Sequence, residues 1–346
     1  MKALRKTKAA AGAELLDLPV PEIGPRDLLV KVKATALCKS DVEVFEWSPL
    51  VQAANYTLPF TMGHEFAGEV VKTGELVQGF VPGDKVAGET HIPCGICREC
   101  RTGNAHICGN HMGVLGRTFN GSFAEYIRLP EVSAIKLAAD ADYVQCSLYE
   151  PLGTAIHALQ KVKVLSGAHI AVLGPGTIGL MTCEAAKAMG VSRVFAVGTN
   201  PERLKYSREL GADAAINTKE QDFVREIKRH TSRLDAVIDC TGNTALINHA
   251  IDALAIAGTL VHMGNVQKEL TIPGFMYRVV YRELTITGIF GRHLYTTWDI
   301  LNSLLESGRV KLEHYVGEVM PLSQYQKGLE HFSRLKGRAV MLPEGE

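Results

Sequence analysis

The fold is decided by the stretch His169-Ile170-Ala171-Val172-Leu173-Gly174-Pro175-Gly176-Thr177-Ile178-Gly179, near the middle of the chain. An apolar run meets a glycine cluster, and apolar sequence continues to Met189, which indicates a buried strand, a tight turn and a helix. In this pattern the first glycine permits the turn, the second lets a pyrophosphate approach the backbone, and the third lets helix and strand pack closely. The helix start offers free N–H groups to phosphate. The context favours a dinucleotide site over an ordinary glycine turn, formed by Gly174, Pro175, Gly176, Thr177, Ile178 and Gly179.

Strand and helix patterns alternate after this turn. We expect strands at 193–197, 235–239 and 258–263, helices at 201–210 and 244–256, and a β-rich run at 284–290. Such alternation predicts an α/β fold with a Rossmann-type, doubly wound parallel sheet. Before the turn we expect strands at 28–36 and within 116–129, and helix within 138–159.

Size and charge set limits on the function. The chain has 346 residues, so two domains are expected. Its 37 basic and 37 acidic side chains balance, so the net charge does not favour binding to nucleic acid or to an anionic membrane. Residues 1–15 lack the apolar core of a signal sequence. The longest charge-free apolar stretch, about 170–183, is short for a membrane span. We predict a cytoplasmic protein without a nucleic-acid or membrane partner.

Four of the eight cysteines have the spacing of a metal site. Cys94, Cys97 and Cys100 follow one another at intervals of three, and Cys108 comes after seven further residues. Four thiolates so close together suit a closed, tetrahedral structural zinc site, which would order a polar, glycine-rich loop. A disulfide cluster and an iron–sulfur cluster are the alternatives.

A second set of residues has the composition of a catalytic zinc site. Cys38 follows the strand expected at 28–36, His64-Glu65 stands between glycines, and Glu150 lies in apolar sequence. Thiolate, imidazole and carboxylate are the mixed ligands that catalytic zinc uses, and a buried carboxylate is usually paired or bound to metal. The alternatives are a small core residue for Cys38 and a solvated turn for His64-Glu65.

In this order the motifs resemble those of the zinc-containing medium-chain dehydrogenases over essentially the whole chain. The shared motifs are Cys38-x-x-Asp41, Gly63-His64-Glu65-x-x-Gly68-x-Val70, Gly83-Asp84-x-Val86, the four cysteines, Glu150-Pro151 and the glycine turn. Within the family the chain is most similar to the L-threonine 3-dehydrogenases and polyol dehydrogenases. That similarity rests on Met1-Lys2-Ala3-Leu4, Glu89-Thr90-His91-Ile92-x-Cys94-Gly95, Glu150-Pro151-Leu152-Gly153 and Gly291-Arg292-His293-Leu294-Tyr295-x-Thr297-Trp298.

The resemblance implies a GroES-like, β-rich catalytic domain over 1–147 with a zinc lobe at about 89–112, a Rossmann domain over 148–287 and a return to the catalytic domain over 288–346. It implies two zinc ions, the catalytic one bound by Cys38, His64 and Glu150, with Glu65 as an alternate or outer carboxylate. Ser40 matches the first hydroxyl of a proton relay. Such a zinc ion keeps an open position at which a substrate hydroxyl loses its proton near neutral pH, before hydride passes to the nicotinamide.

The implied reaction is zinc-dependent, NAD(P)-linked oxidation of a secondary alcohol to a ketone. Its small-molecule substrate would be threonine-like; a polyol, cyclitol or sugar alcohol is the alternative, and a non-catalytic nucleotide sensor is the alternative outside the enzymes. The resemblance also implies a homo-oligomer, a dimer or tetramer, and the run at 284–290 would pair with its copy because an exposed apolar edge strand needs covering.

Three positions depart from the pattern of these relatives. Glu43 stands where the threonine enzymes usually have histidine, and Lys39 replaces a glycine beside Cys38. Gly198 stands where an acidic residue usually binds the ribose of NAD, so the carboxylate that would repel a 2′-phosphate is absent. Polar or basic groups follow it at Thr199, Asn200 and Arg203. The sequence slightly favours NADP over NAD.

Overall fold

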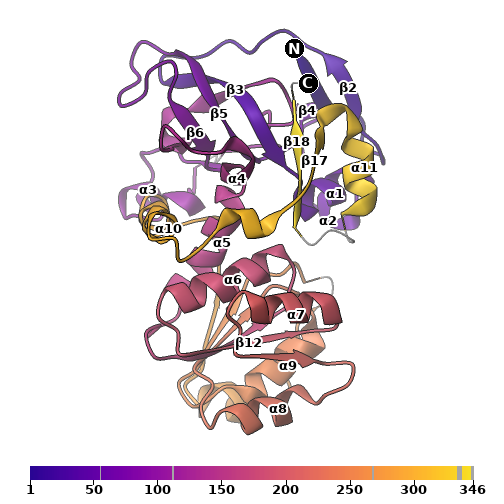
Figure 1. Ribbon diagram of the computed structural model, residues 1–346, viewed down its shortest axis with the longest axis vertical. Coiled ribbons are helices and arrows are strands. Elements are labelled where there is room, and N and C mark those ends of the chain that lie inside the picture. The colour runs from indigo at the N-terminus through magenta and orange to yellow at the C-terminus, as the bar shows by residue number, and fades with distance from the viewer. Residues whose placement is uncertain (55, 111–112, 267–268, 333–336, 344–346) are drawn as a thin grey trace. The chain divides into compact units, whose positions relative to one another are not determined.

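The computed structural model describes residues 1–346 except 55, 111–112, 267–268, 333–336 and 344–346. The chain forms two compact units, which we call unit 1 (Met1–Pro151 with Leu312–Glu346) and unit 2 (Leu152–Lys311). Both ends of the chain belong to unit 1 (Figure 1). The return to unit 1 therefore comes later than the predicted residue 288. The reason is that helix α10 (Thr296–Glu306) packs within unit 2, where Trp298 lies so close to Gly153 that a Cβ there would approach its ring to 2.7 Å.

Unit 1 is built on one large sheet around strand β3 (Asp27–Ala36), whose side chains alternate between buried and half-buried as the sequence predicted. The strand order is β10-β6-β5-β3-β18-β17, and β9 also pairs with β3. These strands are β5 (Glu65–Thr73), β6 (Lys85–Gly88), β9 (Tyr126–Pro130), β10 (Ala134–Lys136), β17 (Val316–Pro321) and β18 (Arg338–Leu342). The last strand of the chain thus lies beside one of the first, β18 being antiparallel to β3 (Figure 1).

Smaller elements surround this sheet. A three-stranded sheet has the order β2-β1-β4, and β7 pairs with β8. The bounds are β1 (Lys2–Lys6), β2 (Glu14–Asp17), β4 (Phe60–Thr61), β7 (His91–Ile92), β8 (Gly113–Val114), α1 (Lys39–Glu46), α2 (Pro49–Gln52), α3 (Arg98–Arg101), η1 (Ala105–Ile107), η2 (Glu131–Ser133), η4 (Leu312–Tyr315), η5 (Leu322–Gln324) and α11 (Tyr325–His331). The helix expected within 138–159 is two helices, α4 (Tyr143–Cys146) and α5 (Tyr149–Gln160), because Asp142 caps a separate first turn.

Unit 2 has the predicted parallel sheet, in the order β13-β12-β11-β14-β15-β16. All five neighbouring pairs are parallel, and the apolar side chains of the four inner strands are buried, which is typical of a sheet covered on both faces. The strands are β11 (His169–Leu173), β12 (Arg193–Gly198), β13 (Ala214–Asn217), β14 (Ala236–Asp239), β15 (Thr259–His262) and β16 (Thr285–Gly288); the helices are α6 (Thr177–Ala188), α7 (Pro201–Glu209), α8 (Phe223–His230), α9 (Thr244–Ala253) and η3 (Met276–Val280). Strand β13 and helix α8 were not predicted.

A buried lysine fastens the start of the chain to helix α1. Lys6 is fully buried, and its Nζ donates hydrogen bonds to the carbonyl oxygens of Ala10 at 2.5 Å, Gly12 at 2.9 Å and Phe45 at 3.1 Å. The same ammonium lies 5.1 Å from the centroid of the Trp47 ring. Because a buried ammonium is stable only with such acceptors, Lys6 holds the loop after β1 against the end of α1.

We predict that Lys6→Met lowers the free energy of unfolding by about 2–3 kcal/mol, because methionine keeps the apolar stem but leaves the carbonyl oxygens without their charged donor. Chemical denaturation measures the change. Lys8→Met is the matched control, since the Lys8 side chain is 79% exposed. Equal stability of the two variants would contradict a stabilising role of the Lys6 ammonium.

Candidate metal centres and cofactor site

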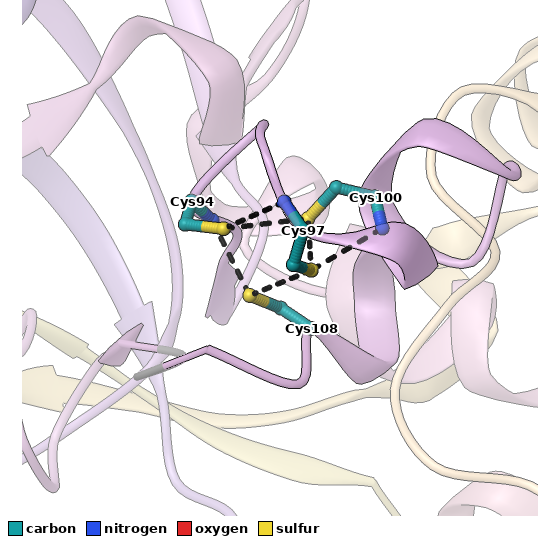
Figure 2. A group of neighbouring side chains, drawn as sticks. All are labelled: Cys94, Cys97, Cys100 and Cys108. Atoms are coloured by element: carbon teal, nitrogen blue, oxygen red, sulfur yellow. Dashed lines mark hydrogen bonds between the residues drawn. The ribbon is translucent and has the colours of Figure 1, made fainter.

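The four predicted cysteines come together in one loop of unit 1. Figure 2 shows their sulfur atoms pointing toward a common centre. The Cys97 sulfur lies 3.4 Å from that of Cys100 and 3.8 Å from that of Cys108, and the Cys94 and Cys100 sulfurs are 3.9 Å apart. These separations are those of thiolates around one tetrahedral ion, and far exceed a disulfide bond of about 2.05 Å.

Backbone N–H groups of the same loop point at the sulfur atoms. The amides of Cys97 and Cys94 donate to Cys94 Sγ and Cys108 Sγ, each at 3.4 Å. The backbone amides of Ile96 and Cys97 lower the pKa of Cys94 to about 6. All eight cysteines of the chain are free thiols, so the disulfide alternative is wrong. The arrangement of the four sulfur atoms fits a metal that binds thiolates.

The second predicted group also assembles within unit 1. Cys38 is the N-cap of α1, His64 directly precedes β5, and Glu65 is the first residue of that strand. One ligand atom from each of these residues lies within 4.8 Å of the others. Asp41 supports the arrangement, because its carboxylate accepts a hydrogen bond from the Cys38 amide at 2.9 Å and lies 3.5 Å from the His64 ring.

A buried ion pair completes this centre. Arg338, from β18, donates to Glu65 Oε1 at 2.9 Å, and its Nη2 lies 3.8 Å from Cys38 Sγ. Burial raises the pKa of the Cys38 thiol, but the charges of Arg338 and His64 outweigh burial and lower the pKa to about 7. Burial also raises the pKa of Glu65 well above its ordinary value, against the opposing charge of Arg338. The centre therefore favours a thiolate, which is the form that binds metal.

The donor set fits zinc. Thiolate, imidazole and carboxylate are all present, and the second carboxylate oxygen of Glu65, Oε2, is buried without a hydrogen-bond partner in the described structure. A buried oxygen of this kind is costly unless a cation or donor reaches it. Glu150 is not in the group: it is the second residue of α5 and accepts a hydrogen bond from the Thr90 hydroxyl at 2.9 Å. Its charge nevertheless acts on Glu65.

The remaining predicted residues of this centre lie on α1. Ser40, in the first turn of the helix, is half-buried. Glu43 lies one turn later, 3.9 Å from the Lys39 ammonium, and burial raises the pKa of its carboxyl. Sequence reasoning did not single out Arg338, because only the pairing of β18 with β3 brings it here. Asp41 was noted only as part of a motif.

The predicted nucleotide residues line one pocket of unit 2. Its wall includes Gly174, Pro175, Gly176, Gly198, Thr199, Asn200 and Arg203, and sequence reasoning missed Thr218, Thr241, Asn243, Ala245, Leu246 and His249. Thr177, Ile178 and Gly179 were also predicted, but they form the first turn of α6 and are not among the residues that line this pocket. Gly174 has φ +89°, and a Cβ at Gly179 would lie 2.0 Å from the Gly174 carbonyl oxygen, so both predicted glycine requirements are met.

Gly198 has a packing function that the sequence did not reveal. A Cβ at this position would lie 2.4 Å from Cδ of Pro175, a ring within the glycine turn. Glycine is therefore required by the close approach of β12 to the turn, whichever nucleotide binds. The lack of a carboxylate at Gly198 remains compatible with a 2′-phosphate, but Gly198 alone does not report cofactor choice.

Comparisons with known proteins agree with the predicted resemblance. Two family descriptions match, "Alcohol dehydrogenase GroES-like domain" over residues 24–139 and "Zinc-binding dehydrogenase" over residues 177–307. The L-threonine 3-dehydrogenase of Caldanaerobacter subterraneus subsp. tengcongensis is 38% identical, and that of Bacillus velezensis is 36% identical, each over 99% of both chains. In the described residues no helix is long and apolar enough to cross a membrane.

Solved structures lead to the same family. The 2R,3R-butanediol dehydrogenase from Bacillus subtilis has a TM-score of 0.88 at 29% identity, covering 99% of both chains. A zinc-binding dehydrogenase from Sinorhizobium meliloti, solved bound to NADP, has a TM-score of 0.88 at 25% identity and the same coverage. The chain belongs to the zinc-binding dehydrogenase family and is an NAD(P)-linked oxidoreductase of the alcohol dehydrogenase type.

Proposed function

We propose that this enzyme oxidises a secondary alcohol with a threonine-like structure, and that it uses two zinc ions and prefers NADP. The observation that carries the proposal is the convergence of Cys38, His64 and Glu65 beside the buried Arg338. The relatives at 34–38% identity are L-threonine 3-dehydrogenases, which makes L-threonine the first substrate to test. A neutral diol is the second candidate, because a structural neighbour is a butanediol dehydrogenase.

The residues of the centre would have different roles in the reaction. Cys38 and His64 would hold the catalytic zinc together with a carboxylate from Glu150 or Glu65, and the bound ion supplies a Lewis acid for the substrate oxygen. Ser40, half-buried on α1, would accept the substrate proton. Glu43 replaces the usual histidine one turn further along the helix and would pass that proton toward solvent.

We predict that Cys38→Ser and Cys97→Ser each lose one of two zinc ions, with different consequences. The Cys38 variant should lose oxidation of L-threonine but still bind reduced cofactor, because the glycine turn belongs to unit 2. The Cys97 variant should mainly lose thermal stability, since its loop depends on metal for order. Elemental analysis, a turnover assay and fluorescence titration with NADPH measure these effects.

Cys146→Ser is the control for both variants, because this buried cysteine belongs to neither ligand group. Retention of both metals by Cys97→Ser would contradict the structural site. Failure of wild type to oxidise L-threonine, diols or polyols with either cofactor would contradict the proposed function.

The cofactor preference rests on the pocket at the end of β12. No acidic side chain is among the described residues of its wall, whereas Arg203 and His249 are basic or protonatable. Arg203 is half-buried on α7, where a guanidinium can form paired hydrogen bonds to phosphate. These groups suit the 2′-phosphate of NADP.

We predict a higher kcat/KM with NADP than with NAD, and that Arg203→Gln reduces the NADP value by about tenfold while changing the NAD value little. Lys205→Gln, an exposed change on the same helix, is the control. A test of a carboxylate at residue 198 needs the double variant Gly198→Asp with Pro175→Ala, because the Pro175 ring occupies the space that a Cβ at residue 198 would take. A wild type that prefers NAD would refute the preference.

We also propose a homo-oligomer that pairs through unit 2. Strand β16 is last in the sheet order, as the predicted pairing requires, and Ile286 on it is 39% exposed. The neighbouring segment around η3 exposes large apolar side chains, namely Phe275, Met276, Tyr277, Val280 and Tyr281. An open edge and an apolar patch on neighbouring segments favour a copy of the same strand as partner.

Ile286→Lys should convert the assembly to a monomer at micromolar concentration, because the added charges would face each other across a two-fold axis. Light scattering coupled to size-exclusion chromatography measures the mass. Val164→Lys, at a residue 70% exposed in the loop before β11, should leave the mass unchanged. A monomeric wild type would rule out this interface.

A further inference from the structure

An arginine beside the catalytic centre has no function in the proposal above. Arg117 stands in the turn between β8 and β9, directly after Gly116. A Cβ at Gly116 would lie 2.8 Å from the carbonyl oxygen of Gly63, so the two backbones are in direct contact. Gly63 immediately precedes His64. The turn that carries Arg117 is therefore packed on the segment that delivers a metal-ligating histidine.

The guanidinium of Arg117 is held on an aromatic platform. Its centre lies 5.1 Å from the centroid of the Tyr56 ring, and its Nη2 donates to the carbonyl oxygen of Ala54. The Tyr56 ring is itself fixed, stacked on Phe60 at 5.3 Å and edge-on to Trp47 at 6.1 Å. A stacked guanidinium of this kind loses little conformational freedom when it binds a ligand.

The Tyr56 phenol connects this arginine to the metal centre. Burial raises the pKa of Tyr56, and the charges that act on the phenol are those of Arg117, Asp41, His64 and Glu43. One ring is thus within electrostatic reach of both Arg117 and the residues around Cys38. Together with the contact of Gly116 and Gly63, this places the turn that carries Arg117 beside the segment that leads into His64.

The nearby acidic groups already have partners. Asp41 accepts from the Cys38 amide and faces His64, and Glu43 lies near Lys39. Within the described part of the chain no carboxylate pairs with Arg117, and its Nε is buried without a hydrogen-bond partner. By contrast, the buried Arg338 is paired with Glu65. A fixed cation beside a reaction centre, without an acidic partner, is suited to an anion.

We propose that Arg117, held on Tyr56, binds an anionic group of the substrate. The substrate is then a secondary alcohol that carries a carboxylate or a phosphate, and neutral diols are poor substrates. This inference rests on the proposed function for the oxidised alcohol, but it adds the group that selects among alcohols. L-Threonine supplies the carboxylate, and a polyol phosphate supplies the alternative.

Steady-state kinetics with L-threonine, sorbitol 6-phosphate and 2,3-butanediol test the proposal. Arg117→Met should reduce kcat/KM for the better anionic substrate by about 10- to 100-fold, mainly through KM, and should affect butanediol much less. Arg117→Lys should restore part of the loss. Arg128→Met is the matched control, because Arg128 also lies over an aromatic ring, that of Phe119 at 5.4 Å, and has Asp27 as partner at 3.5 Å.

Calorimetric titration of the zinc-loaded enzyme with the same three alcohols, in the presence of NADPH, measures binding without turnover. Tighter binding of an anionic alcohol than of butanediol, lost in Arg117→Met, would support the inference even if no alcohol is oxidised, in which case only the proposed function fails. Equal binding of charged and neutral alcohols by wild type, or equal losses for all three in the variant, would overturn the inference.

Discussion

The buried contact between Arg338 and Glu65 is the interaction on which the cluster of Cys38, His64 and Glu65 in unit 1 depends. An isolated carboxylate would be unstable in so buried a place, and Arg338 supplies the compensating charge. The same guanidinium lowers the pKa of the Cys38 thiol. Because Arg338 begins β18, the centre forms only after the end of the chain has returned to pair with β3. Removing either partner would leave a buried charge uncompensated.

This dependence explains which parts of the centre could be predicted from sequence. The four cysteines lie within one short loop, so their spacing alone indicates a metal site. Cys38 and His64 are further apart, and only the resemblance identified them as ligands. Arg338 and Glu65 are 273 positions apart, and no local pattern connects them. Glu150 was predicted as a ligand from the resemblance, whereas the structure gives its carboxylate a hydrogen bond from the Thr90 hydroxyl.

For the fold as well, local patterns were predictable from sequence and contacts between distant residues were not. The alternating pattern of unit 2 predicted its sheet because the inner parallel strands are buried and apolar, and because helices α7 and α9 begin at local caps, Asn200 and Asn243. Strand β13 was missed because it has only four residues, two of them alanine, and carries a weak pattern. The return to unit 1 was placed too early, because the packing of Trp298 on Gly153 is a long-range contact.

The same residue can be explained by ligand binding or by packing, and the three-dimensional structure is needed to tell these two constraints apart. Gly198 was interpreted as the loss of a carboxylate, but the Pro175 ring leaves no room for any Cβ, so packing is sufficient to explain the glycine. Arg117 is the opposite case: its sequence context is an ordinary turn, while the structure holds its guanidinium on the Tyr56 ring and packs its turn against Gly63, the residue before His64. Specificity for cofactor and for alcohol should therefore depend on cations, Arg203 and Arg117, rather than on the absence of a carboxylate. A cation contributes attraction to an anion directly, whereas a missing carboxylate only removes repulsion.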